Sequence, residues 1–148
     1  MPIEIEVADT QVHLKVDRAD VMRLARDVLL KENRPVASIS IAIVDNATIH
    51  SLNLKHLGHD WPTDVITFPL SSSEEPALAG EVVVSAEMAV ATALELRGEP
   101  HRELALYLVH GLLHLCGYDD SDDASSGAMK RRQEELLESV AGAWRAEK

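Results

Sequence analysis

The segment from residue 100 to residue 116 constrains the fold more than any other part of the chain. If this segment is helical, apolar side chains cover nearly every side of it: Leu104, Ala105, Leu106, Leu108, Val109, Leu112, Leu113 and Leu115. A helix that is apolar all round lies in a protein core or a membrane. Because His110 interrupts the stretch and its length falls short of the ~20 apolar residues that span a bilayer, we expect a core helix. Pro100 suits its first position, and Gly117 can adopt the left-handed conformation that ends it.

Other segments predict the elements that cover this helix. Alternating apolar residues in the segment IEIEV at the N-terminus, together with three further β-rich runs, predict strands near 3–7, 36–44, 64–70 and 80–84. Capping residues and apolar stripes predict further helices: one after Asp17 or Asp20, one over 45–54, one from Ser85 to Gly98, and one over about 122–144. Breakers and polar residues predict loops at 55–63 and 71–79. We therefore expect an α/β protein of the α+β type, with a small mixed sheet of about four strands flanked by helices.

Size and composition narrow the class of protein. A chain of 148 residues fits a single domain spanning 1–148. The net charge of −11 argues against a broad basic face for nucleic acid, although it leaves room for a locally basic cleft. Cys116 is the only cysteine, so no intramolecular disulfide can form, and the acidic N-terminus lacks the basic and apolar regions of a secretory signal. These features predict a cytoplasmic protein without a membrane segment.

Two histidines on the core helix indicate a metal site. His110 and His114 are four residues apart, so both imidazoles leave the same helical face and can meet one ion. The break at Gly117 lets the chain turn back, so that Asp120 can approach the same ion from a third direction. Three protein ligands leave a fourth position open, which is the arrangement of a catalytic zinc. The predicted metal group is therefore His110, His114 and Asp120, at the end of the core helix.

Simpler explanations of these residues remain open. Either histidine could be a hydrogen-bonded core residue, and Asp120 could cap the last helix. Placement favours the metal, because buried imidazoles in an apolar helix need partners. Gly111 also costs about 1 kcal/mol relative to Ala in a helix, which indicates a close approach to the backbone there. The spacing resembles that of the metzincin peptidases, but Gly111 stands where those enzymes carry their general base, so a metallopeptidase is the less favoured alternative.

Three ordered blocks resemble one known family. The segment HGLLHLCGYDD at 110–120 resembles the HGxLHLxGYDH motif of the endoribonuclease YbeY family of bacterial rRNA maturation factors. Residues 52–69 resemble its LN…R…PTDVLSFP segment, and residues 80–85 resemble its GDI-x-IS strand. Order, spacing and length agree over essentially the whole chain.

The resemblance implies a hydrolase of the cytoplasm, namely a metal-dependent, single-strand-specific endoribonuclease. Its partners would be single-stranded RNA and the small ribosomal subunit, in rRNA processing, ribosome biogenesis and ribosome quality control, with no role at DNA or at a membrane. His110, His114 and Asp120 fall on the three zinc-ligand positions of the family, which implies one bound Zn²⁺ as cofactor.

The chain departs from the family pattern at two positions. The third ligand of the family is His, and here it is Asp120, which can bind zinc through oxygen but lowers the positive charge of the site. An arginine of the family is replaced by Leu57, which cannot hold a phosphate. His56 and His59 lie nearby in the sequence and could donate hydrogen bonds instead, or they could be solvent-exposed bystanders.

The remaining catalytic candidates are Thr63 and Asp64. Thr63 could bond a phosphate and Asp64 could orient a water or a histidine, while roles in the turn before the strand explain both residues equally well. The acidic charge balance and Leu57 keep a non-catalytic alternative open, in which the protein is a ribosome-associated maturation factor with a structural metal.

Overall fold

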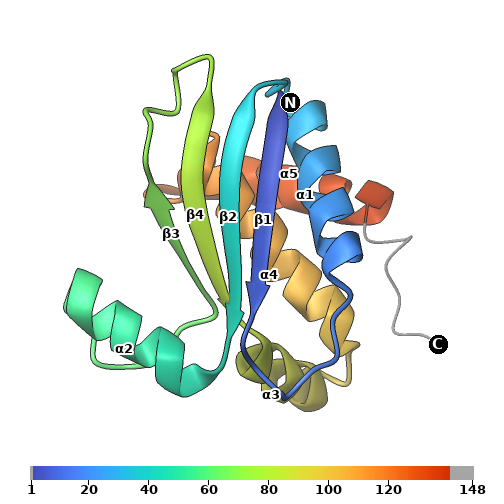
Figure 1. Ribbon diagram of the computed structural model, residues 1–148, viewed down its shortest axis with the longest axis vertical. Coiled ribbons are helices and arrows are strands. Elements are labelled where there is room, and N and C mark those ends of the chain that lie inside the picture. Colours follow the sequence, from blue (N-terminus) through green and yellow to red (C-terminus); the bar gives the residue numbers. More distant parts are fainter. Residues whose placement is uncertain (1, 141–148) are drawn as a thin grey trace.

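The computed structural model describes residues 2–140 and shows a mixed sheet covered by helices (Figure 1). Within these residues the elements in chain order are β1 (Ile3–Asp9), α1 (Arg18–Lys31), β2 (Ala37–Val44), α2 (Asn46–Leu57), β3 (Val65–Pro69), β4 (Leu78–Ser85), α3 (Ala86–Leu96), α4 (Pro100–Leu115) and α5 (Asp123–Val140). The strand order is β1-β2-β4-β3, in which β1, β2 and β4 are parallel and β3 runs antiparallel to β4 at one edge. The predicted α/β fold with a four-stranded mixed sheet is thus confirmed.

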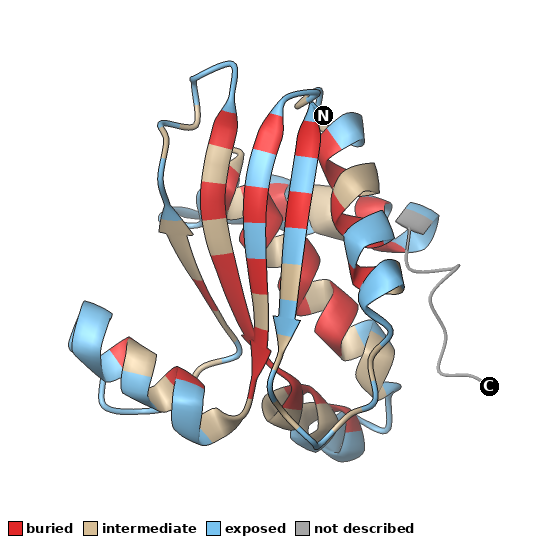
Figure 2. Cartoon of the chain, in the orientation of Figure 1, coloured by how far each residue is buried: buried red, intermediate tan, exposed pale blue. Residues whose placement is uncertain are grey.

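Helix α4 is the centre of the fold, as its all-round apolar surface predicts. It packs on β3 and β4 and is covered by α1, α3 and α5. In Figure 1, α4 and α5 lie behind the sheet and α1 runs beside β1. Leu104, Leu108 and Leu112 are fully buried within it. Strand β1 alternates as a half-buried strand does, with Ile3 and Ile5 buried and Glu4 and Glu6 exposed, whereas the second half of β4 is buried on both faces (Figure 2).

Several element boundaries differ from prediction by one to three residues: β1 continues to Asp9 instead of residue 7, β2 begins at Ala37 instead of residue 36, and β3 covers Val65–Pro69 instead of 64–70. Helix α2 continues to Leu57, so the predicted loop at 55–63 begins only at residue 58. The helix ends there because Gly58 takes the left-handed conformation (φ 73°). Strand β4 starts at Leu78 instead of residue 80, because Leu78 and Ala79 already pair with Ala37 and Ser38 of β2.

The remaining helix ends lie close to prediction. Of the two residues predicted to cap α1, Asp17 is the cap, because its side chain accepts a hydrogen bond from the Ala19 amide. At the end of α3 the left-handed residue is Arg97 (φ 58°), one position before the predicted Gly98. Helix α5 begins at Asp123, and the predicted continuation to about residue 144 lies outside the described residues beyond 140.

The expected close approach at Gly111 is confirmed, and the neighbour is the sheet. A Cβ atom at Gly111 would lie 2.7 Å from Cγ1 of Val82 on β4 and 3.1 Å from Cγ2 of Val65 on β3. This contact sets α4 directly on the β3 edge and thereby fixes where His110 and His114 project.

A smaller apolar cluster lies on the opposite face of the sheet, beneath α2. Its buried members are Val44, Ile49, Ile66 and Val83. Thus α2 and α4 pack on opposite faces of the sheet next to β3. None of the helices among the described residues combines the length and apolar character that crossing a membrane requires.

Candidate metal centre

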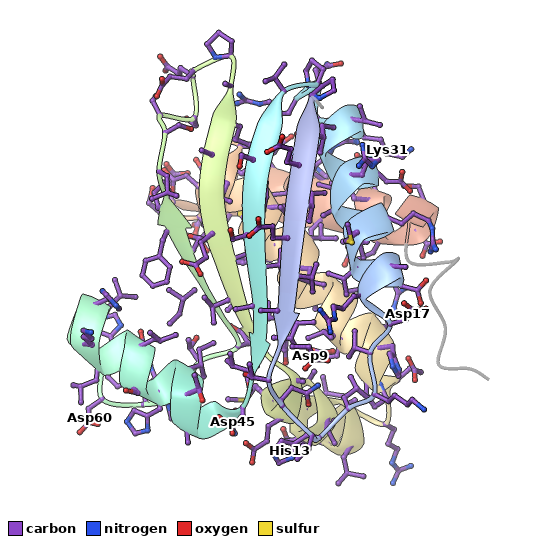
Figure 3. The ribbon with its side chains drawn as sticks, viewed as in Figure 1. Asp9, His13, Asp17, Lys31, Asp45 and Asp60 are labelled. Atoms are coloured by element: carbon purple, nitrogen blue, oxygen red, sulfur yellow. The ribbon has the colours of Figure 1, made fainter. Side chains whose placement is uncertain are left out.

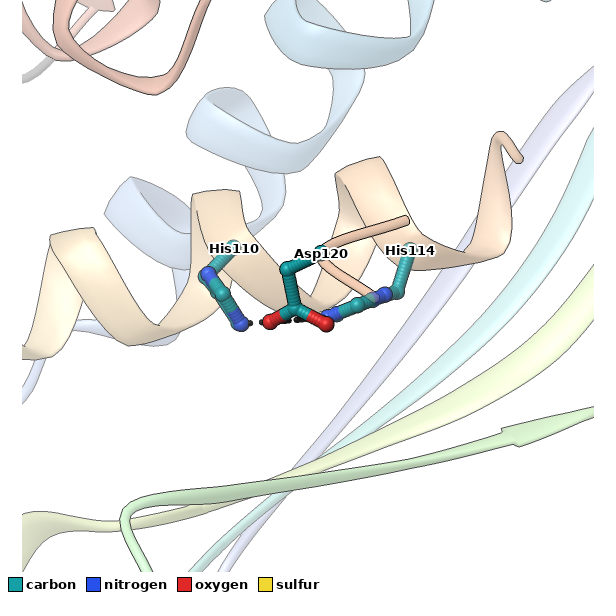
Figure 4. A group of neighbouring side chains, drawn as sticks. All are labelled: His110, His114 and Asp120. Carbon is teal, nitrogen blue, oxygen red and sulfur yellow. Dashed lines mark hydrogen bonds and ion pairs between the residues drawn. The ribbon is translucent and has the colours of Figure 1, made fainter. Parts of the chain in front are cut away.

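The last two turns of α4 and the loop after it bring the three predicted ligand residues together (Figure 4). The Nε2 atoms of His110 and His114 are 3.1 Å apart, and Oδ2 of Asp120 is 3.8 Å from Nε2 of His114. One candidate ligand atom from each residue lies within 4.8 Å of the others. Ligands at 2.0–2.1 Å from a tetrahedral ion are about 3.3 Å apart, so this grouping has the dimensions of a zinc site.

The turn after α4 brings Asp120 next to His114. Gly117 is left-handed (φ 107°), and its amide donates to the carbonyl oxygen of His114 at 3.0 Å. The next amide, of Tyr118, donates to the Leu113 carbonyl oxygen at 3.0 Å. A side chain at Gly117 would be strained and would also meet Ser73 at 3.1 Å, so glycine is needed for this return of the chain.

The second nitrogen of each imidazole is held by a carbonyl oxygen. Nδ1 of His110 lies 2.8 Å from Oε1 of Gln133 on α5, and Nδ1 of His114 lies 3.1 Å from the backbone oxygen of Tyr118. A carbonyl oxygen only accepts, so each Nδ1 carries the hydrogen and donates it. When both rings are neutral, this leaves a lone pair on each Nε2 atom, and the two Nε2 atoms face each other. Metal-binding histidines are oriented in this way, and the donor set therefore fits a divalent ion such as zinc.

The protonation of His114 is consistent with this geometry. Burial lowers the pKa of His114, the proximity of His110 lowers it further, and Asp120 opposes both effects. The ring is therefore neutral near pH 7, as a ligand must be. The two imidazoles are half-buried, in contrast to the burial expected from the apolar helix, and Asp120 has an exposed side chain. The centre thus opens to solvent on one side.

A hollow of about 200 Å³ adjoins the centre. Its lining residues come from α4, from the loop after it and from α5: His110, Asp120, Ser126, Met129, Lys130 and Gln133. Residues 130–132 of α5 form a basic run, Lys-Arg-Arg, whose first and last members have different roles. Arg132 pairs at 2.6 Å with the largely buried Glu32 and anchors α5, whereas the exposed Lys130 lines the hollow.

Lys130 and Gln133 could not be assigned to this centre from sequence. They lie 20 and 23 residues after His110, on another helix, and only the packing of α5 on α4 brings them beside it.

The other sequence candidates do not belong to the metal-competent group that the described residues form from His110, His114 and Asp120. Thr63 and Asp64 bond each other, with Thr63 Oγ1 at 3.3 Å from the Asp64 carboxylate, and the Asp64 backbone oxygen accepts from the amide of Ser85 on β4. These contacts match the turn roles that were the alternative for both residues. Burial raises the pKa of the Cys116 thiol to about 11, as suits a packing residue and not a ligand.

The residues around the missing arginine form an exposed surface. Leu57, at the end of α2, has 51% of its surface exposed. His56 contacts the edge of Phe68 with ring centroids 5.2 Å apart, and His59 stacks on Trp61. The side chain at position 57 is therefore uncharged, and the basic residues in the last turn of α2 are Lys55 and His56.

Fold and site define a small α/β protein with a cluster of two histidines and one aspartate at the end of its core helix. The family model described as endoribonuclease YbeY matches residues 5–141, and the chain belongs to this family of endoribonucleases. Members of the family are nucleases that hydrolyse phosphodiester bonds of RNA, so the chain is classed as an enzyme.

Individual relatives support this assignment over most of the chain. Endoribonuclease YbeY of Protochlamydia amoebophila is 36% identical over 135 residues, which cover 90% of each chain. The corresponding protein of Carboxydothermus hydrogenoformans is 34% identical over 137 residues and is covered to 96%. Among solved structures, the solution structure of TM1509 from Thermotoga maritima is similar with a TM-score of 0.69 and 29% identity, covering 96% of this chain and 91% of that one.

Proposed function

We propose that this endoribonuclease depends on one zinc ion held by His110, His114 and Asp120, and that it cuts single-stranded RNA. The observation that carries the proposal is the pair of Nε2 atoms 3.1 Å apart, each on a ring whose Nδ1 atom is bonded to a carbonyl oxygen. Without a cation, two lone pairs at this distance repel each other, so the arrangement is explained best by an ion between them.

The ligand set suits catalysis better than a purely structural metal. Three protein ligands leave a position open, and the side chain of Asp120 is 53% exposed, so a phosphate can reach the centre. A bound zinc ion supplies Lewis acidity for the hydrolysis of a phosphodiester. Asp120 contributes a negative charge, so the centre is one charge unit less positive than one with three neutral imidazoles.

Lys130 can supply the positive charge for a phosphate that the uncharged Leu57 cannot. Its side chain lines the same hollow as His110 and Asp120, where it can contact a phosphate oxygen held beside the centre. The positive charge would therefore reach the substrate from α5 instead of from the end of α2.

We further propose that the RNA is that of the small ribosomal subunit, in the cytoplasm, where cleavage serves rRNA maturation and ribosome quality control. The support is the resemblance of the motifs at 52–69, 80–85 and 110–120 to those of the bacterial rRNA maturation factors. We also propose that residues 1–148 form one domain. The net charge of −11 and the loss of the arginine at Leu57 favour the rival, a ribosome-associated factor with a structural metal.

Metal analysis and RNA cleavage by the purified protein test the proposal together. We expect about one zinc per chain and cleavage of single-stranded RNA that is lost with a chelator and in His114→Ala. His13→Ala is the matched control, because His13 pairs with Glu87 away from the centre. Asp120→Ala should lose metal and Asp120→His should retain it. Cleavage that persists in His114→Ala would refute the metal-dependent mechanism, whereas small-subunit binding without cleavage would support the non-catalytic rival.

A further inference from the structure

We propose that His59 and Trp61 form a stacking platform for a base of the RNA. The inference rests on the proposed single-stranded RNA substrate and adds a second contact site, away from the metal centre. The two rings are nearly parallel, with an interplanar angle of 8° and centroids 4.7 Å apart. Aromatic residues make up only 3% of the chain, yet one of its two tryptophans is 54% exposed here, and His59 is exposed as well.

The loop that carries the rings is fixed to α2. The His59 amide donates to the backbone oxygen of Asn53 at 3.2 Å, and the Asn53 side-chain amide donates to the backbone oxygen of Trp61 at 2.9 Å. Asn53 itself is only 2% exposed. Asp60, which separates the two ring residues in the sequence, pairs with His50 of α2 at 2.8 Å, and Figure 3 shows Asp60 on the outer side of α2. The platform is thus preformed, which reduces the entropy lost when a ligand binds.

The position of the platform suits a strand of RNA that also reaches the metal centre. Alternate residues of β3 face opposite sides: Val65 approaches Gly111 of α4, whereas Ile66 and Phe68 pack with α2. The edge strand β3 therefore separates the helix that holds the histidines from the helix that holds the platform. Figure 4 shows β3 running past the centre, so a flexible single strand that crosses this edge could contact both.

The chemistry of the surface favours a base over a phosphate. Leu54 and Leu57 are about half exposed at the end of α2, and Leu57 offers no charge. Stacking on an aromatic ring tolerates every base, because each base has a flat π-face. It requires bases that are free of their own duplex, which accounts for a preference for single strands. At this end of the molecule, a base stacked on the rings of His59 and Trp61 would replace the contact with RNA that an arginine at position 57 would make.

RNA binding by substituted full-length proteins tests the platform. An oligoadenylate of eight nucleotides and a hairpin duplex are the probes, with metal removed by chelator so that the RNA stays intact. We expect Trp61→Ala to bind the oligoadenylate about 5- to 100-fold more weakly, Trp61→Phe to retain most of the affinity, and Leu94→Ala on α3 to match the wild type. The slope of log K against log salt should stay unchanged in Trp61→Ala, since no phosphate contact is removed.

A spectroscopic readout tests stacking directly. In a Trp144→Phe background, Trp61 is the only tryptophan, and its fluorescence should be quenched when the oligoadenylate binds but not when the hairpin is added. Equal affinity of Trp61→Ala and wild type, or equal losses in Trp61→Phe and Trp61→Ala, would overturn the platform, as would equal losses for single strand and duplex. These results would refute the platform alone. The proposed function would be refuted by a different result, namely a wild-type protein that shows no metal-dependent cleavage of RNA.

Discussion

Substitution of two helical glycines by alanine should change the stability of this protein in opposite directions. Gly111 on α4 faces the sheet, where a Cβ atom would lie 2.7 Å from Cγ1 of Val82. Val82 is fully buried and β-branched, so its side chain has little freedom to move aside. Gly127 on α5 is partly exposed, and the atom nearest to a new Cβ there is the flexible end of the Arg131 side chain, at the ordinary contact distance of 3.6 Å.

The expected magnitudes follow from two terms. Alanine is more favourable than glycine by about 1 kcal/mol in the interior of a helix, and this gain applies at both positions. At Gly111 overpacking costs about 1–3 kcal/mol, and the value lies in the upper half of this range because valines of two strands are contacted. We therefore expect Gly111→Ala to lower the free energy of unfolding by about 1–2 kcal/mol and Gly127→Ala to raise it by up to about 1 kcal/mol.

Urea unfolding followed by circular dichroism measures both changes. For a chain of this size, each kcal/mol shifts the melting temperature by about 2–4 °C, so thermal unfolding provides a second measurement. The double variant Gly111→Ala, Val82→Ala should lose less free energy of unfolding than the two single variants lose together, by about 1 kcal/mol or more. The reason is that the smaller side chain at position 82 relieves the contact with the new Cβ atom. If Gly111→Ala stabilises the protein as much as Gly127→Ala does, the close packing of α4 on the sheet is refuted.

Three further predictions concern the centre and its surroundings. Gln133→Ala should weaken zinc binding about 10- to 100-fold, measured by competition with a chromophoric chelator, because His110 loses the acceptor that orients it; unchanged affinity would exclude this role. Lys130→Ala should slow cleavage and reduce the salt slope of RNA binding by about 1, whereas an unaltered slope would show that Lys130 contacts no phosphate. Native Cys116 should react with a disulfide reagent at pH 8 far more slowly than in urea, because burial raises its pKa to about 11. The buried thiol favours its neutral form, so the stability it contributes is present below pH 9 and is lost as the pH rises towards about 11; equal reaction rates in the folded and unfolded protein would contradict this.

The parts of the molecule that depend on local periodicity could be predicted from sequence. The apolar surface of α4 identified the core helix, and the four-residue spacing put His110 and His114 on one face. Gly117 indicated the turn that returns Asp120, because few residues besides glycine adopt its backbone conformation. The end of α2 was placed three residues early, since Lys55 and His56 are exposed and carry no apolar period that would extend a helix.

The contacts that depend on packing could not be predicted in this way. The partner of His110 is Gln133, and the neighbour of Gly111 is Val82; each pair joins elements whose relative register is set only when the core forms. The burial of the two imidazoles was overestimated for the same reason. An apolar helix predicts a core position for its whole surface, but the turn at Gly117 leaves one side of its C-terminal end uncovered.

The difference between sequence pattern and three-dimensional packing also changes the interpretation of Leu57, which stands where the family motif has arginine. In the sequence, this replacement removes a positive charge and argues against catalysis. In three dimensions Leu57 belongs to the α2 face of the sheet, whereas Lys130 lies with His110 and Asp120 around the hollow on the other side. A cation affects a phosphate by its distance from it and not by its place in the chain. Leu57 therefore leaves position 57 uncharged where the exposed rings of His59 and Trp61 can bind a base, while Lys130 places a positive charge next to the proposed zinc ligands.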